Sequence, residues 1–135
     1  AYIGANPDPD YGSKRPELVA RTKAPDVLFR SHSAPLGLTF YDGEQFPADY
    51  RGDAFIGMQG SWNAAKPEGY MVARVPFENG KPKGYYEVFA SGFWLSGGDK
   101  ARVWGRPIGV AVAKDGSLLV ADETGLVVWR IAYGR

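Results

Sequence analysis

The sequence contains no cysteine among its 135 residues, which excludes disulfide bonds, thiolate catalysis and thiolate metal sites and leaves the cellular compartment open. Histidine is nearly absent too, because His32 is the single imidazole in the chain. One histidine cannot build a His-rich zinc site, and the HExxH pattern of zinc proteases does not occur. Every hydrophobic run falls far short of the ~20 residues that a membrane-spanning helix needs, so no membrane span is expected.

A net charge of either sign is also lacking, since 16 basic and 15 acidic residues leave a formal charge of +1. The basic residues form no block, which argues against nucleic acid and anionic membranes as partners. What the chain does have is glycine (18), proline (10) and 14% aromatic residues. This composition favours many short strands joined by tight turns, and hence an all-β fold.

An internal repeat is the strongest signal in the sequence. Pro35–Phe77 and Pro107–Tyr133 match element by element, and each reads as three short strands. In each copy the first two strands are strongly apolar, as for strands covered on both faces, and the third carries an arginine nearer the surface. Asp42-Gly43 and Asp115-Gly116 predict hairpin turns, because glycine tolerates a positive φ. The matched positions are Pro35 with Pro107, Gly37 with Gly109, Gly43 with Gly116, Gly69 with Gly125, Arg74 with Arg130, and Phe77 with Tyr133.

The repeat predicts a β-propeller fragment with one complete four-stranded blade and most of the last blade. Tyr85–Ala90 supplies the fourth strand, and Asp26–Arg30 is expected to be the outer strand of a preceding blade. Two blades alone would leave apolar faces bare, so we expect the rest of the propeller as a partner. A small β-sandwich of about seven strands is the alternative. The expected division is 1–34 for the entry loop and outer strand, 35–90 for the full blade, 91–106 for a loop, and 107–135 for the last blade with three strands.

The start of the chain at Ala1 lacks an initiator methionine and a charged leader, which suggests an entry in mid-chain. Close behind it, Asn6, Asp8 and Asp10 place oxygen ligands at alternate positions, as calcium loops do. The spacing misses the EF-hand pattern, and two prolines equally favour a stiff surface turn. Both interpretations stay open.

Three further segments are candidates for chemistry. His32 precedes an innermost strand, where propeller loops ring the axial channel, although a partly buried histidine bonded to backbone is an equal alternative. Gln59 and Trp62 lie in a turn that carries an amide, a hydroxyl and an indole, which suits the recognition of a sugar or a planar ring. The alternative is a capped turn with one packed tryptophan. Arg106, next to Trp104, aligns with Ala34 in the first copy, so the blade itself does not need arginine there. Its planar fork suits a carboxylate, and a surface ion pair is the alternative.

Several motifs in order resemble the glucose/sorbosone dehydrogenase family, closest to its sorbosone-dehydrogenase-like bacterial branch. They are Tyr2–Gly12, Ser-His-Ser-Ala-Pro-Leu-Gly-Leu-Thr-Phe-Tyr-Asp-Gly at 31–43, Gly-Ser-Trp-Asn at 60–63, and Gly105–Asp122. The resemblance implies the C-terminal portion of a six-bladed propeller that oxidises a sugar or aldehyde by hydride transfer to pyrroloquinoline quinone (PQQ), with calcium as a possible second cofactor. It also implies a periplasmic or secreted bacterial protein.

The resemblance assigns roles to individual residues as well. Arg106 would bind the carboxylates of the quinone, and His32, Trp104 and Trp62 would lie at the same channel mouth. Gln59 stands where relatives have a basic residue, and Ile108 stands where some have a second arginine. The general-base histidine would lie upstream of Ala1, so no catalytic residue is assigned in this chain. The rival function is a non-catalytic propeller that binds sugars or proteins, favoured by the neutral residue at position 59.

Overall fold

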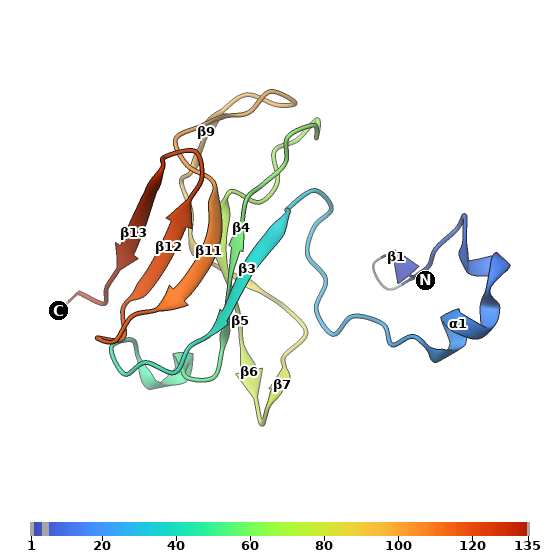
Figure 1. Cartoon of the computed structure of the whole chain (residues 1–135), viewed down its shortest axis with the longest axis horizontal. Coiled ribbons are helices and arrows are strands. Elements are labelled where there is room, and N and C mark those ends of the chain that lie inside the picture. The colour runs from blue at the N-terminus through green and yellow to red at the C-terminus, as the bar shows by residue number, and fades with distance from the viewer. Residues whose placement is uncertain (1, 4–5, 135) are drawn as a thin grey trace.

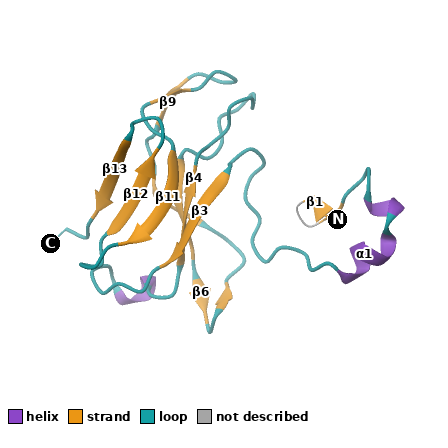
Figure 2. Cartoon of the chain, viewed as in Figure 1, coloured by secondary structure: helices purple, strands orange, loops and turns teal. Residues whose placement is uncertain are grey.

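The computed structural model describes residues 2–3 and 6–134, and it is an all-β arrangement of antiparallel sheets with few helices (Figures 1 and 2). A four-stranded sheet has the order β3-β4-β5-β8, and a three-stranded sheet has the order β11-β12-β13. The strands are β3 (Pro35–Phe40), β4 (Ala54–Met58), β5 (Met71–Val75), β8 (Glu87–Ala90), β11 (Pro107–Val112), β12 (Leu118–Asp122) and β13 (Val127–Ile131).

The two sheets repeat one another down to an irregularity in register. In the first sheet Pro35 lies opposite Met58, and the register shifts before Gly37 meets Gly57. In the second sheet Pro107 lies opposite Asp122, and the register shifts in the same place. A bulge of this kind strengthens the local twist and terminates regular pairing. The sequence repeat therefore specifies the same three-strand unit twice.

Close backbone contact joins the sheets along their first strands. A Cβ atom added at Gly37 would lie 2.7 Å from the Cα atom of Gly109, with the carbonyl oxygen of Ile108 nearer still. At Gly57 an added Cβ would lie 3.0 Å from that same carbonyl oxygen. Only glycine permits this approach, so β3 and β4 rest directly on β11.

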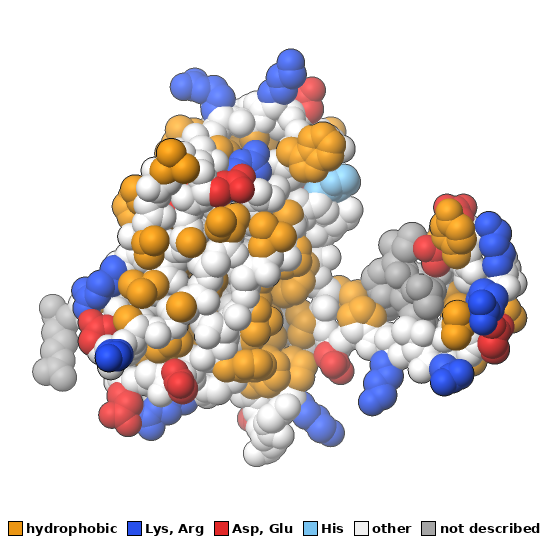
Figure 3. Space-filling model, in the orientation of Figure 1, with side chains coloured by type: hydrophobic (Ala, Val, Ile, Leu, Met, Phe, Trp, Pro, Cys, Tyr) orange, Lys and Arg blue, Asp and Glu red, His pale blue; other side chains and the backbone are white. Residues whose placement is uncertain are grey.

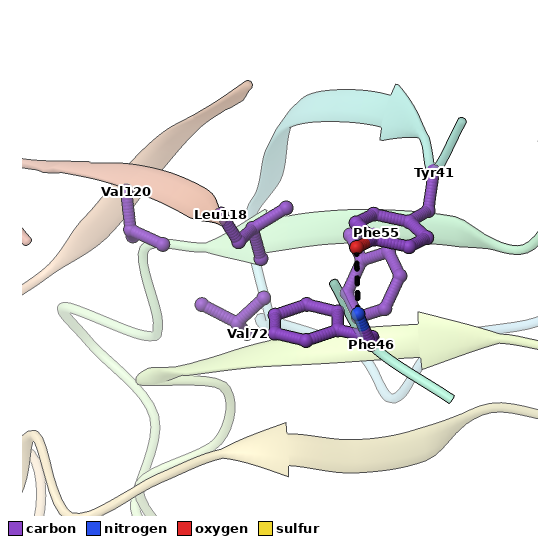
Figure 4. Close-up of a cluster of buried hydrophobic side chains, with 6 residues drawn as sticks. All are labelled: Tyr41, Phe46, Phe55, Val72, Leu118 and Val120. Atoms are coloured by element: carbon purple, nitrogen blue, oxygen red, sulfur yellow. Dashed lines mark hydrogen bonds between the residues drawn. The ribbon is translucent and has the colours of Figure 1, made fainter. Parts of the chain in front are cut away.

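A buried core with several aromatic rings, Tyr41 among them, includes side chains from both sheets (Figure 4). The Tyr41 hydroxyl donates to the carbonyl of Gly116 at 2.7 Å and accepts from the N–H groups of Phe46 at 2.9 Å and Gln45 at 3.2 Å. Its ring stacks on Phe46 at a centroid distance of 4.9 Å. One side chain thus ties the loop after β3 to the turn of the second sheet. The buried members of this core are Tyr41, Phe46, Phe55, Val72, Leu118 and Val120.

Replacing Tyr41 with phenylalanine should lower the free energy of unfolding by about 2 kcal/mol. The ring stays packed, but the Gly116 carbonyl and the Phe46 N–H lose a buried partner. Denaturant unfolding measures the effect, and Tyr85→Phe, at an exposed tyrosine, serves as the control. Equal midpoints for the two variants would contradict this role of the hydroxyl.

Both outer faces of the paired sheets are apolar. On the four-stranded sheet Leu36, Leu38 and Phe40 are all more than half exposed. On the three-stranded sheet the outer face holds a shallow groove. Hydrophobic side chains gather over this part of the molecule in Figure 3. Contiguous exposed apolar faces mark contact surfaces in soluble proteins. The groove is lined by Gly109, Val110, Ala111, Leu119, Ala121 and Val128.

The outer strand predicted at Asp26–Arg30 is wrong, because these residues form no strand. Val27 and Phe29 instead pack against the outer face of the four-stranded sheet, and the Phe29 ring lies 5.0 Å from that of Tyr86. The apolar side chains of the segment find a partner, whereas its backbone has no paired strand among the described residues. Burial of these side chains and the ion pair of Arg30 with Glu68 therefore place the segment.

The turn conformation predicted at Asp42-Gly43, with a positive φ at glycine, is also wrong. The connection from β3 to β4 runs from residue 41 to 53 and includes the 3₁₀ helix η2 (Ala48–Tyr50). Gly43 has no positive φ, unlike Gly116 at φ 83° in the second copy. Its small size serves packing, since an added Cβ would lie 2.7 Å from the Tyr41 hydroxyl.

Short elements complete the chain. The predicted 91–106 loop contains a hairpin, and the N-terminal part contains a short helix that the strand patterns did not predict. The N-terminal segment lies apart from the sheets in Figure 1. These elements are β1 (Tyr2–Ile3), β2 (Asn6–Pro7), η1 (Gly12–Lys14), α1 (Pro16–Arg21), β6 (Phe77–Glu78), β7 (Lys81–Pro82), β9 (Trp94–Ser96) and β10 (Arg102–Val103).

Candidate functional site

Four connections meet at one end of the two sheets, the upper end in Figure 1. Because the strands are antiparallel, the start of β3 lies beside the end of β4, and the start of β11 lies beside the end of β12. The candidate residues lie on these connections: His32 before β3, Gln59 and Trp62 after β4, and Trp104 and Arg106 before β11. The topology thus brings the predicted segments to one end of the molecule.

Arg106 is half-buried and reaches across from the second sheet to the first. Its Nη1 donates to the main-chain carbonyls of Gln59 at 3.2 Å, Gly60 at 3.2 Å and Ser61 at 3.3 Å. Its Nη2 donates to the Ser61 carbonyl at 3.2 Å, and its guanidinium carbon lies 5.0 Å from the centroid of the Tyr70 ring. The guanidinium is therefore held by neutral groups of the loop after β4.

No carboxylate among the described residues lies within ion-pair distance of the Arg106 guanidinium. The surface ion pair considered from the sequence is therefore not formed there. The carbonyls and the Tyr70 ring that contact the guanidinium are neutral, so none of these groups cancels its positive charge. Arg106 is consequently the place at this end of the sheets that best suits an anionic ligand.

Gln59 uses its amide within the protein. Its Nε2 donates to Oε1 of Glu123 at 2.7 Å. Glu123 follows β12 as Gln59 follows β4, so the two residues occupy the same place in the repeat. Glu123 was not predicted as a site residue, although the repeat alignment pairs it with Gln59. This carboxylate adds a negative charge to the rim on which Arg106 lies.

Asp122, the last residue of β12, is a second residue that the sequence analysis missed. It is 3% exposed, and its Oδ1 accepts from the N–H groups of Arg106 at 2.8 Å, Gly125 at 2.9 Å and Thr124 at 3.0 Å. Its Oδ2 accepts from the Trp129 indole at 3.0 Å. Burial opposes ionisation, but these four hydrogen bonds outweigh it and hold the pKa of Asp122 below the usual value.

Trp104, two residues before Arg106 in the chain, belongs to an aromatic cluster. Trp104 stacks on the buried Phe93 at 4.8 Å and meets Trp129 edge-on at 5.0 Å. Its indole N–H donates to the carbonyl of Gly92, so the ring is fixed while 40% of the residue stays exposed. Trp62, at 78% exposure, is not the packed tryptophan of the capped-turn interpretation. Both tryptophans leave ring surface open to a ligand.

His32 is exposed and adopts a left-handed backbone conformation, with φ 67°. Its side chain makes no hydrogen bond or ion pair with any described residue, so the structure does not support a buried histidine bonded to backbone. The His32 loop does contact the loop after β4, because Gln59 N–H donates to the carbonyl of Ala34 at 3.0 Å and Gly60 N–H to that of Ser33 at 3.0 Å. His32 thus lies on the same rim without a defined partner.

The N-terminal calcium loop finds no support in the geometry. Oδ1 of Asp8 accepts from the N–H groups of Asp10 at 2.9 Å and Tyr11 at 3.0 Å, which is the geometry of a turn closed by an aspartate. Within residues 2–3 and 6–134, no three His, Cys, Asp or Glu side chains are grouped as a metal site. None of the helices in this part of the chain is long and apolar enough to cross a membrane.

Comparisons with known proteins give a consistent family. The sequence matches the model of a family described as TrAA12-like over residues 15–132. It is 36% identical over 106 residues to an uncharacterised protein of Borreliella burgdorferi, covering 78% of this chain and 27% of that protein. The structure is similar to the holo form of the pyranose dehydrogenase PQQ domain from Coprinopsis cinerea, with a TM-score of 0.69 at 25% identity, covering 86% of this chain and 31% of that one.

A second structural neighbour is the calcium structure of Trichoderma reesei Carbohydrate-Active Enzymes Family AA12. The TM-score is 0.56 at 21% identity, over 82% of this chain and 27% of that one. At this identity the likeness shows the fold alone. The chain thus spans about a third or less of the length of the relatives it matches.

Proposed function

Because the chain belongs to the TrAA12-like family, we propose that it is part of a quinone-dependent dehydrogenase that oxidises a sugar. The similarity to a pyranose dehydrogenase PQQ domain supports the cofactor and the substrate class. Within this class, the motifs that resemble sorbosone dehydrogenases favour an aldose or an aldehyde as substrate. The quinone, when bound, supplies the redox chemistry by accepting a hydride from the substrate.

The proposal depends mainly on the environment of the Arg106 guanidinium. PQQ is an anion with carboxylate groups, and Arg106 is a half-buried cation without a carboxylate partner among the described residues. Its Nη groups already donate to main-chain carbonyls, whereas its Nε–H makes no hydrogen bond to a described residue, so this donor is the one proposed for a carboxylate of the cofactor. In this function Arg106 binds and orients that carboxylate, while Trp104 and Trp62 offer exposed ring surface for packing against the cofactor or the substrate. His32 lies on the same rim and is proposed as a neighbour of the bound ligands.

The rest of the propeller is a necessary part of this proposal. The apolar outer faces of both sheets need partners, and the chain spans about a third or less of its relatives. We propose that it forms the C-terminal blades of a six-bladed ring whose other blades supply the general-base histidine. Calcium as a second cofactor, and a periplasmic or secreted location, are proposed on the family resemblance.

Replacing Arg106 with alanine in the complete protein should weaken PQQ binding about 10- to 100-fold, because a charged hydrogen bond of about 1.5–3 kcal/mol is lost. Titration of the apoprotein with PQQ measures the dissociation constant. The fold should survive, since the repeat position of Arg106 in the first sheet is already Ala34. Arg102→Ala, at an exposed arginine near the same strand, removes the same charge and is the matched control. Equal affinities for wild type and Arg106→Ala would refute the assignment.

A non-catalytic sugar- or protein-binding propeller is the second candidate, and the Gln59–Glu123 contact favours it. That contact engages the amide at position 59 and leaves the Glu123 carboxylate on the same rim, where its negative charge repels an anionic cofactor. Wild-type protein that binds sugars but shows no PQQ binding in the titration would decide for this candidate. Gln59→Lys restores a basic residue there, and it should strengthen PQQ binding if the site is a cofactor site.

A further inference from the structure

We propose that Asp122 is a positioning residue for Arg106. The buried carboxylate of Asp122 fixes the main chain at Arg106 and so orients the guanidinium toward an anionic group of the ligand. The inference rests on the proposed function, because it names a residue that builds the same site. Asp122 lies opposite Pro107 in the ladder, one residue beyond Arg106. It therefore acts from the neighbouring strand on the start of β11.

The hydrogen bonds of Asp122 join two connections. The bond from the Arg106 N–H at 2.8 Å holds the segment before β11, and the bonds from Thr124 at 3.0 Å and Gly125 at 2.9 Å hold the segment after β12. The Glu123 N–H donates to the Arg106 carbonyl at 3.2 Å, so the peptide groups on both sides of Arg106 are tied to this turn. One carboxylate oxygen of Asp122 thus accepts hydrogen bonds from both connections, the one that contains Arg106 and the one that contains Glu123.

The Asp122 carboxylate is closely packed on several sides. A Cβ atom at Gly105 would collide with Oδ2 of Asp122 and would lie 2.8 Å from Cδ1 of Phe93. A Cβ atom at Gly125 would lie 2.9 Å from the same Oδ2. Two glycines therefore make the space that the carboxylate fills. The Trp129 indole closes the remaining side, at 3.0 Å from Oδ2.

The first sheet has neither an aspartate nor an arginine at the equivalent repeat positions. The repeat partner of Asp122 is Met58, and the repeat partner of Arg106 is Ala34. Ala34 adopts a left-handed conformation with φ 49°, whereas Arg106 has no positive φ. The unit that carries the arginine also carries the carboxylate that bonds its N–H. Because the sister sheet forms without either residue, neither is required by the blade itself, and the pair points to the site.

A double-mutant cycle in the complete protein, with PQQ as the titrated probe, tests the inference. Asp122→Ala should weaken PQQ binding at least about 10-fold, as the loss of supporting groups does at other sites. In the Arg106→Ala background the same change should have no further effect, because Asp122 acts through Arg106. An equal loss in both backgrounds would overturn the proposal, and so would unchanged affinity of Asp122→Ala. Should the alanine variant not fold, the cycle is run with Asp122→Asn, for which a several-fold loss is expected.

The control is Asp53→Asn, because Asp53 is another buried aspartate, 1% exposed, that accepts from an arginine and a main-chain N–H away from this rim. It should destabilise the protein and leave the affinity for PQQ unchanged. A second measurement needs no ligand. In Asp122→Asn the NMR signal of the Arg106 main-chain amide proton should move upfield, and this proton should exchange faster with solvent. In Asp53→Asn both the chemical shift and the exchange rate should stay unchanged. Wild-type protein that fails to bind PQQ defeats the proposed function, whereas an unmoved Arg106 amide in Asp122→Asn defeats the positioning role.

Discussion

Replacing Arg74 with alanine is expected to lower the free energy of unfolding by about 3–5 kcal/mol, because it leaves a buried charge without its partner. Nε of Arg74 donates to Oδ2 of Asp53 at 2.5 Å. The Arg74 side chain is 12% exposed and that of Asp53 is 1% exposed. Burial opposes the charge of Arg74, yet the hydrogen bond and the attraction of Asp53 raise its pKa above the usual value. The contact with Asp53 therefore stabilises the charged form of Arg74.

The Arg74 side chain also holds the long connection after β3. Its Nη2 donates to the carbonyl of Asp49 at 2.8 Å, and its guanidinium carbon lies 3.9 Å from the centroid of the Tyr50 ring. Oδ1 of Asp53 in turn accepts from the N–H of Phe77 at 2.7 Å. Removing the arginine therefore disturbs η2 and the end of β5 as well as the ion pair.

Arg130 provides the matched control, because it occupies the same place in the repeat as Arg74. It bonds to Asp115, but its side chain is 54% exposed, and exposed ion pairs contribute little. Denaturant unfolding of the complete protein compares the two variants. Arg130→Ala should remain near the wild type, and similar losses for the two arginines would contradict the role assigned to burial.

The strands of both sheets could be predicted from the sequence, because each of the three strands of the repeat occurs in two matching sequence segments. Pro35 with Pro107 and Gly37 with Gly109 mark equivalent positions, and the structure places them in equivalent registers. The surface position expected for the arginine of the third strand holds for Arg130 but not for Arg74. Strand periodicity does not encode the loop of Ala48–Tyr50 that covers the latter side chain.

The candidate site was predicted only in part. Arg106 was selected because its repeat partner is alanine, and the structure indeed leaves it without a carboxylate partner among the described residues. Its contacts with three carbonyls, and the buried Asp122 behind it, depend on how two connections meet in space. The short helix Pro16–Arg21 was missed although it has a proline at its start and Glu17 in its first turn, which are ordinary signals of a helix N-terminus.

Replacing Gly37 with alanine is expected to lower the free energy of unfolding by about 3 kcal/mol, the upper range for overpacking. The added Cβ would meet the main chain of Ile108 and would lie 2.7 Å from the Cα atom of Gly109. Main-chain atoms cannot rotate away as a side chain can, so β3 and β11 must separate along the whole contact. Denaturant unfolding of the complete protein measures the loss.

Gly109 is the repeat partner of Gly37, so comparing alanine variants at the two positions tests the proposed propeller ring. Among the described residues an alanine at Gly109 meets only the Cβ atom of Ala121 at 3.4 Å, an ordinary contact. Gly109 nevertheless lines the apolar outer face of β11, where a following blade would pack as β11 packs on β3. If that blade exists, Gly109→Ala should destabilise the complete protein about as much as Gly37→Ala, because the same close approach recurs there. A neutral Gly109→Ala beside a damaging Gly37→Ala would mean that no innermost strand lies against this face, and the ring proposal would have to be given up.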